Sequence, residues 1–267
     1  MTRRPMMAAN WKMNMLVREA EDYVARLLPR ISGAEGVDVA IFAPFTCLNT
    51  VARMTQDTPV VAGAQNFYYE DSGAFTGEVS APMLKDVGAG AVIVGHSERR
   101  EIFGETDEMV ARKTDRAIKA GLLPVVCVGE TKEERDAGRM WDKVSGQVRA
   151  VFEHLDAGEV GGDALVFAYE PVWAIGTGDV ASPEDAQDAI GGIRDLLREL
   201  GGEDFANKVR ILYGGSIKPA NITDIMAQKD VDGGLVGGAS LEADSFAELV
   251  HVAAETKGDR APSPELW

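Results

Sequence analysis

VRILYGGSIKPANITDIMAQKDVDGGLVGGAS, residues 209–240, contains two short apolar segments separated by an amphipathic one. Residues 209–215 and 231–238 are rich in aliphatic side chains and run into glycines, as buried strands commonly do. Between them, residues 219–228 space their apolar side chains as a helix does. The stretch therefore predicts a strand–helix–strand unit with parallel strands.

The same alternation extends back to the N-terminus. We expect eight strands, in residues 5–10, 37–44, 59–66, 91–96, 123–130, 165–170, 209–215 and 231–238. Helices are expected in residues 16–30, 46–54, 83–88, 106–121, 141–155, 182–200, 219–228 and 245–255. Thr106 and Ser182 mark the starts of two of these helices, because each is an N-cap residue followed by acids.

Eight alternating units in roughly 250 residues fit a closed (β/α)8 barrel, an α/β fold of one domain, better than an open doubly wound sheet. No G-x-G-x-x-G motif follows the first strand, which weakens a dinucleotide-binding interpretation. We predict that residues 1–255 form the barrel. Residues 256–267 are mostly polar and carry prolines, so we expect a flexible tail there.

The composition limits the classes of partner. A formal charge of -16 and a pI near 4.6 argue against nucleic acid, which is bound by clustered Lys and Arg. The excess acid serves either solubility or a salt-rich cytoplasm. The N-terminus has no apolar signal region and no segment reaches membrane-spanning length, so we expect a cytoplasmic protein.

The two cysteines, Cys47 and Cys127, lie in apolar strand-like contexts without metal-ligand spacing. We therefore expect reduced core thiols, no metal and no cofactor.

Three chemically reactive side chains follow predicted strands. Lys12 follows the first strand, His96 ends the fourth and Glu170 ends the sixth. Each has an ordinary explanation alone: a solvated lysine, a hydrogen-bonded structural histidine and a helix-side acid. Because strand ends of a barrel meet on one rim, the three together favour an active site.

The glycine-rich turns after the last two strands suggest an anion site. Ser216 lies in the first turn, and Gly237 and Gly238 form the second. Glycines let backbone N–H groups approach a phosphate, and a phosphate site at this position recurs in barrels. Tight corners of the barrel would explain the glycines alone equally well, but their position after the last two strands favours the phosphate site.

Seven motifs occur in a fixed order along the chain. They are NWKMN (10–14), GAQN with GAFTGEVS (63–80), VGHSERR with FGE (94–105), CVGET (127–131), AYEPVWAIGTG (168–178), YGGSIKP (213–219) and GGLVGGASL (233–241). In this order and spacing the sequence resembles the triosephosphate isomerase family from Asn10 to about Leu249.

This resemblance implies interconversion of dihydroxyacetone phosphate and D-glyceraldehyde 3-phosphate through an enediolate. It implies that Glu170 is the base and His96 a neutral electrophile, an arrangement for which this family is itself the standard example. Lys12 would supply fixed positive charge beside the substrate oxygens, and Asn10 would hydrogen-bond there. Glu98 would support the site from near Lys12.

The family also has a lid that closes over the substrate, again a standard example of such a loop. By resemblance the lid comprises Pro171, Val172 and Trp173 as first hinge, Ala174, Ile175 and Gly176 as tip, and Thr177 and Gly178 as second hinge. Ile175 would cover the base, and the Gly176 amide would join Ser216, Gly237 and Gly238 around the phosphate. Tyr213 would meet the closed lid. The alternative is a loop that packs permanently on the barrel.

An aromatic stretch indicates an interface. In this family the loop after the third strand inserts into a second subunit, so Phe67, Tyr68, Tyr69 and Phe75 would be exposed interface residues. Thr76 would contact Asn10 and Lys12 of the partner, which implies a homodimer. Met15 departs from the small residue common in the family beside this contact.

Other functions stay open at this point. A sugar-phosphate epimerase would bring metal-ligating His and Asp to the strand ends, but only three histidines exist and His154 and His251 fall in helices. An aminoaldose isomerase is a further barrel enzyme. A binding or scaffold protein could keep the fold without chemistry, although Lys12, His96 and Glu170 are all present.

Overall fold

The computed structural model describes residues 3–174 and 181–258, which form a closed barrel of eight strands. Each strand pairs in parallel with the next, and β1 pairs with β8. Strands β1 to β8 cover Met6–Asn10, Asp38–Ala43, Val60–Ala64, Ala91–Val94, Leu123–Val128, Val166–Tyr169, Arg210–Tyr213 and Gly233–Val236. The predicted (β/α)8 barrel is confirmed, with a strand in each predicted segment.

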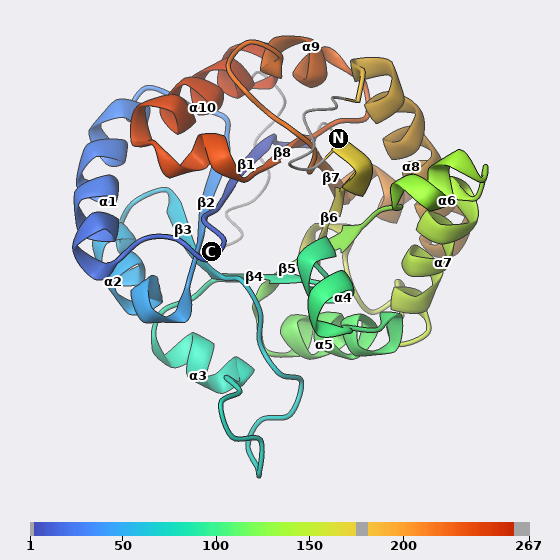
Figure 1. Ribbon diagram of the computed structural model, residues 1–267, viewed down its shortest axis with the longest axis horizontal. Coiled ribbons are helices and arrows are strands. Elements are labelled where there is room, and N and C mark those ends of the chain that lie inside the picture. Colours follow the sequence, from blue (N-terminus) through green and yellow to red (C-terminus); the bar gives the residue numbers. More distant parts are fainter. Residues whose placement is uncertain (1–2, 175–180, 259–267) are drawn as a thin grey trace.

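The helices form an outer ring around the strands (Figure 1). Helices α1 to α5 cover Val17–Ile31, Phe45–Thr55, Ala81–Asp86, Ser97–Phe103 and Asp107–Lys119. Helices α6 to α10 cover Lys132–Asp136, Met140–Phe152, Pro183–Lys208, Ile222–Ala227 and Ala243–Lys257. Short 3-10 turns η1, η2 and η3 cover Gly162–Ala164, Val172–Ala174 and Gly238–Leu241. The side chains of Thr106 and Ser182 cap α5 and α8, as predicted.

Four helices differ from the sequence-based expectation. The short helices α4 and α6 lie in segments where no full helix was predicted, because each is shorter than a periodic apolar pattern can reveal. Helix α8 continues to Lys208 across a kink at Gly202, whose φ of 84° a glycine adopts without steric cost. Helix α10 runs to Lys257, two residues past the predicted end of the barrel at residue 255. Residues 259–267 lie outside the described residues.

The strands are buried on both faces, which explains their continuous apolar sequences. One hydrophobic core fills the barrel, and a second lies between the strands and the helices. Gly63 on β3 leaves room for Phe42 inside the barrel, because a Cβ there would lie 2.5 Å from the phenylalanine ring. This packing fixes the strand ends that carry the candidate site.

The N-terminal ends of the strands hold ion pairs. Arg194 on α8 is buried and donates to Asp232 at 2.6 Å and to Asp230 at 2.9 Å. Burial lowers the pKa of Arg194, and the two carboxylates oppose that shift. These groups lie at the face opposite the candidate site and support the fold.

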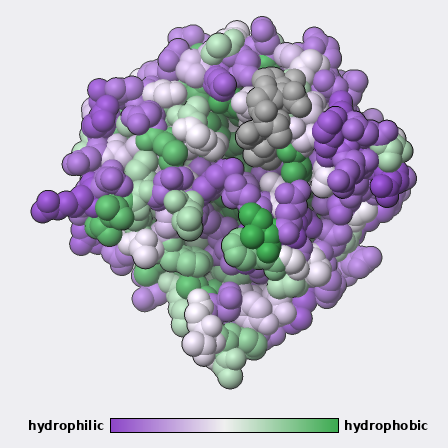
Figure 2. All heavy atoms as spheres, viewed as in Figure 1, coloured by the Kyte–Doolittle hydropathy of each residue, from purple (hydrophilic) through white to green (hydrophobic). Residues whose placement is uncertain are grey.

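Among the residues that the structure describes, no helix is long and apolar enough to cross a membrane. Polar side chains cover most of the face in Figure 2, with hydrophobic groups gathered in places across its lower half.

Candidate active site

One cavity of about 590 Å³ at the C-terminal ends of the strands collects the predicted site residues. It is lined by Asn10, Lys12, His96, Glu170, Ser216, Gly237 and Gly238. Glu98 lies just outside it and is paired with Lys12. The barrel thus brings together groups from β1, β4, β6, β7 and β8, as the strand-end argument predicted.

Glu170 follows β6 and is 2% exposed. Its Oε2 accepts a hydrogen bond from the Ser97 N–H at 2.9 Å, and its Oε1 lies 3.0 Å from His96 Nε2. The backbone N–H of Glu170 donates to Val128 at 2.8 Å. A Cβ on Gly214 would lie 2.9 Å from Glu170 Cγ, so the side chain is closely confined.

The hydrogen bonds of His96 define its proton position. Nδ1 accepts a hydrogen bond from the Glu98 N–H at 3.2 Å, so Nδ1 carries no proton. The ring proton therefore lies on Nε2, which points toward Glu170. The Glu98 carboxylate is 3.7 Å from Nδ1 and has its other oxygen on Lys12. Nε2 thus offers an N–H donor beside the cavity.

Lys12 has an unusual backbone conformation, with φ of 52°. Its N–H donates to Asn10 Oδ1 at 3.0 Å, and its carbonyl accepts from Gln65 Nε2 at 2.9 Å. Its ammonium lies 2.7 Å from Glu98, and a Cβ on Gly237 would approach Lys12 Cε to 3.3 Å. A positive φ at a non-glycine residue is held only by surrounding contacts and often marks a functional position.

The far end of the cavity is formed by the turns after β7 and β8. Asn221 holds the first turn: its Oδ1 accepts from the Lys218 N–H at 2.8 Å, and its Nδ2 donates to the Ser216 carbonyl at 2.9 Å. Gly215 permits the turn, because a Cβ there would lie 2.2 Å from the Tyr213 hydroxyl. Backbone amides in such turns are suited to anions.

The segment after Glu170 is anchored at one end. In η2, the Trp173 indole N–H donates to the Glu130 carboxylate at 2.8 Å, and the Tyr169 hydroxyl donates to it at 3.0 Å. Arg135 stacks over Trp173 at 4.5 Å and also contacts Glu130. Burial and then Glu130 raise the pKa of Tyr169. Pro171, Val172, Trp173 and Ala174 are described, whereas Ile175, Gly176, Thr177 and Gly178 lie outside the described residues.

The Tyr213 hydroxyl is buried and has no hydrogen-bond partner among the residues that the structure describes. Burial raises the pKa of Tyr213 to about 12. A buried hydroxyl without a partner is costly, so a donor or acceptor arriving from a neighbouring segment would be stabilising here.

The predicted interface loop needs one correction. Phe67 is not exposed: it is 0% exposed and belongs to the hydrophobic core of this chain. Tyr68 and Tyr69 are half-buried and stacked on each other, while Phe75 and Thr76 are exposed. Sequence could not separate Phe67 from its neighbours, because all of the aromatic residues occur together in one loop.

Comparison with known proteins decides the family. The triosephosphate isomerase family profile matches residues 5–253. The chain belongs to the triosephosphate isomerase family. It is 74% identical over 252 residues to the triosephosphate isomerase of Rubrobacter xylanophilus, covering 94% of this chain and 98% of the relative. Enzymes of the same name from Roseiflexus sp. and Chloroflexus aurantiacus are each 51% identical over 249 residues, covering 93% of this chain and 97% and 99% of the relatives.

Membership in the triosephosphate isomerase family makes this chain an isomerase, and it is this family, distinct from the sugar-phosphate epimerases, that sets the scaffold and epimerase alternatives aside. Within the described ranges, no group of three or more His, Cys, Asp or Glu residues is arranged to hold a metal ion. Both cysteines are free and buried. Burial, and then the nearby Glu170 carboxylate, raise the pKa of the Cys127 thiol.

Sequence reasoning missed four residues around this candidate site. Glu130 and Gln65 each follow a strand, so the strand-end rule could have found them. The Ser97 amide and the Arg100 guanidinium act through contacts that depend on the tertiary fold. No local pattern indicates those two.

Proposed function

We propose that this chain interconverts dihydroxyacetone phosphate and D-glyceraldehyde 3-phosphate through an enediolate. One observation carries the proposal: Glu170, the His96 Nε2–H and the Lys12 ammonium face one cavity that ends in the turns after β7 and β8. This isomerisation requires a base, a hydrogen-bond donor for the developing oxyanion and a site that binds the phosphate.

The proton path follows from these positions. Glu170 takes a proton from the carbon beside the carbonyl and returns it to the neighbouring carbon. His96 donates its Nε2 hydrogen bond to the substrate oxygen that becomes negative, with Lys12 and Asn10 beside it. In this structure His96 Nε2 lies 3.0 Å from the Glu170 carboxylate. The bound substrate oxygen must therefore replace Glu170 as the partner of this N–H. The Lys12 charge stabilises both the enediolate and the phosphate.

The phosphate is expected to lie at the turns of Ser216, Gly237 and Gly238, which line the same cavity. A lid of residues 171–178 would then close over it, with Ile175 over the base and the Gly176 amide on the phosphate. Two observations support this proposal: Trp173 gives the lid a fixed first end, and the buried Tyr213 hydroxyl has no hydrogen-bond partner among the described residues. Excluding water prevents the enediolate phosphate from eliminating phosphate.

A coupled assay on glyceraldehyde 3-phosphate tests this function. The wild-type protein is expected to isomerise the substrate, to be inhibited competitively by phosphoglycolate, and to release little inorganic phosphate. A variant lacking Ile175 and Gly176 is expected to release inorganic phosphate and methylglyoxal, because the intermediate is no longer sealed. Absence of isomerisation by the wild type would contradict the function. Clean isomerisation by the deletion variant would contradict the lid alone.

We also propose a homodimer in which the loop after β3 inserts into the partner. Large apolar side chains are exposed beside the site: Met13 at 96%, Ile102 at 70% and Phe103 at 67%. A cavity of about 240 Å³ next to Lys12 is lined by Met13, Phe45 and Phe103. The loop that carries Thr76 extends away from the barrel (Figure 1). A monomer rarely exposes such a patch, and an inserted loop would cover it.

Sedimentation of wild type and Thr76→Arg tests the dimer. Wild type is expected to remain dimeric at nanomolar concentration. Thr76→Arg is expected to raise the dimer Kd by about 100-fold or more, because burying an unpaired charge costs several kcal/mol. Thr256→Arg places the same change on the exposed face of α10 and should leave the dimer intact. Stable, active wild-type monomers would refute the proposal.

A further inference from the structure

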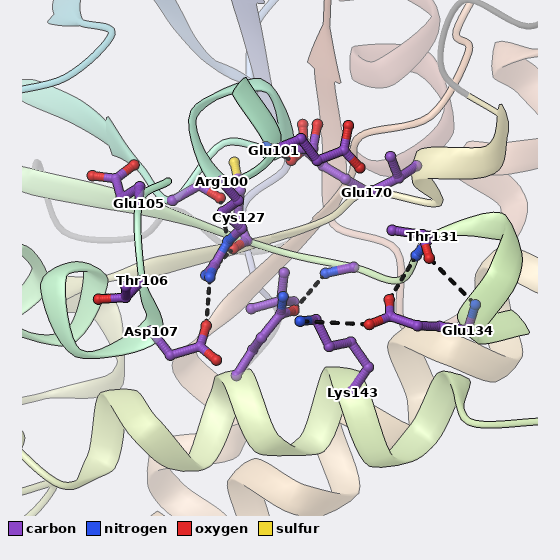
Figure 3. A pocket seen from close by; sticks show the side chains of 16 residues that line it. Arg100, Glu101, Glu105, Thr106, Asp107, Cys127, Thr131, Glu134, Lys143 and Glu170 are labelled. Atoms are coloured by element: carbon purple, nitrogen blue, oxygen red, sulfur yellow. Dashed lines mark hydrogen bonds and ion pairs between the residues drawn. The ribbon is translucent and has the colours of Figure 1, made fainter. Parts of the chain in front are cut away.

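Arg100 on α4 and Glu170 both line a second cavity of about 320 Å³ (Figure 3). Its Nε donates to the Gly95 carbonyl at 2.7 Å, and its Nη2 donates to the Cys127 carbonyl at 3.2 Å. Its Nη1 is paired with Asp107. One guanidinium therefore joins the end of β4, the end of β5 and the start of α5.

The position of this bridge is specific. The pairing of β4 with β5 ends at Val94 and Val126, and Arg100 binds the carbonyl of the next residue on each strand. The guanidinium thus bridges β4 and β5 at the point where their strand pairing ends. Gly95 has φ of 71°, and a Cβ there would lie 2.9 Å from Arg100 Nη2. The glycine leaves the space that the guanidinium occupies.

The two segments that Arg100 joins, at the ends of β4 and β5, both form hydrogen bonds with Glu170. Ser97, two residues after Gly95, donates its N–H to the Glu170 carboxylate at 2.9 Å. Val128, one residue after Cys127, accepts the Glu170 backbone N–H at 2.8 Å. Arg100 therefore fixes the two segments that position the backbone and the carboxylate of Glu170. Arg100 does not line the 590 Å³ cavity, so it would act through Glu170 and not on substrate.

We propose that Arg100 is a positioning residue for Glu170, holding the ends of β4 and β5 at the separation that aims the carboxylate into the substrate cavity. The proposal rests on the proposed role of Glu170 as base. A planar guanidinium with several N–H donors can bind two carbonyls and a carboxylate in fixed directions. A lysine ammonium at this position cannot reproduce that geometry.

The test is chemical rescue of Arg100→Ala. Its kcat is expected to fall about 100-fold, because displacement of a reacting group by about 1 Å has that effect. KM should stay within about threefold, because Arg100 is absent from the substrate cavity. The second cavity opens beside Asp107 and Lys143, which are 41% and 39% exposed, so guanidinium ion can enter it. Guanidinium chloride well below unfolding concentrations, compared with matched KCl, should restore kcat about tenfold or more.

Lys143→Ala is the matched control, because Lys143 lines the same cavity from α7 (Figure 3). It should keep wild-type kcat and show no response to guanidinium. If Arg100→Ala does not fold, Arg100→Lys decides: it is expected to lose about tenfold or more in kcat at unchanged KM.

Three results would overturn the positioning role. The first is a wild-type kcat in the Arg100 variants. The second is a fall in kcat/KM that comes from a higher KM and not from a lower kcat. The third is a loss of kcat in Arg100→Ala that guanidinium does not restore. Glu170→Asp is assayed beside them. If Glu170→Asp is fully active, the proposed base fails; if it is impaired and the Arg100 variants are not, only the positioning inference fails.

Discussion

Glu170→Asp is expected to lower kcat by about 100-fold or more while KM stays within about threefold. Removing one methylene withdraws the carboxylate by about 1 Å from the carbon-bound proton, and proton transfer is sensitive to that distance. The backbone cannot follow, because the Glu170 N–H is bound to Val128 and a Cβ on Gly129 would meet the Glu170 carbonyl at 1.8 Å.

The measurement is steady-state kinetics in both directions, with substrate deuterated at the transferred position. A primary isotope effect should appear or increase in Glu170→Asp, since proton transfer becomes slower than the other steps. Glu101→Asp makes the same change at an exposed glutamate on α4 and should keep wild-type rates. Equal kcat in Glu170→Asp and wild type would rule out Glu170 as the base.

Lys12→Met is expected to lower kcat/KM by about 100- to 1,000-fold, the usual effect of removing one electrostatic contact to a developing oxyanion. The ammonium faces the cavity and pairs with Glu98 at 2.7 Å. Methionine keeps much of the side-chain volume and removes the charge. Both the phosphate and the enediolate lose an interaction, so KM should rise and kcat should fall.

Lys132→Met is the control for this change. Lys132 is an exposed lysine on α6 that also pairs with a carboxylate, that of Asp136, at 3.2 Å. Its loss should leave kcat/KM within about twofold, because exposed ion pairs contribute little. Phosphoglycolate affinity, measured by calorimetry, should fall in Lys12→Met only. Unchanged affinity and rate in Lys12→Met would remove Lys12 from the proposed site.

The barrel was predictable because each strand is a short apolar segment buried on both faces, and each long helix carries an apolar stripe. The strand-end rule predicted that Lys12, His96 and Glu170 would meet, and they line one cavity. Short helices α4 and α6 carry too few residues to show a period, so neither was predicted as a full helix. Phe67 was misplaced because its burial depends on what covers the loop.

By itself, the sequence determined the alternation of strands and helices, the strand ends that hold reactive groups, and the family, since these depend on residue type and spacing along the chain. The tertiary structure alone decided two sets of partners: Ser97 for Glu170, and the two carbonyls for Arg100. It also gave the ion pair of Glu98 with Lys12, which the family resemblance had placed only nearby. The Lys12–Glu98 and Ser97–Glu170 pairs are separated by 86 and 73 residues. Local patterns encode burial and backbone conformation, whereas contacts over such separations exist only once the barrel has closed and packed.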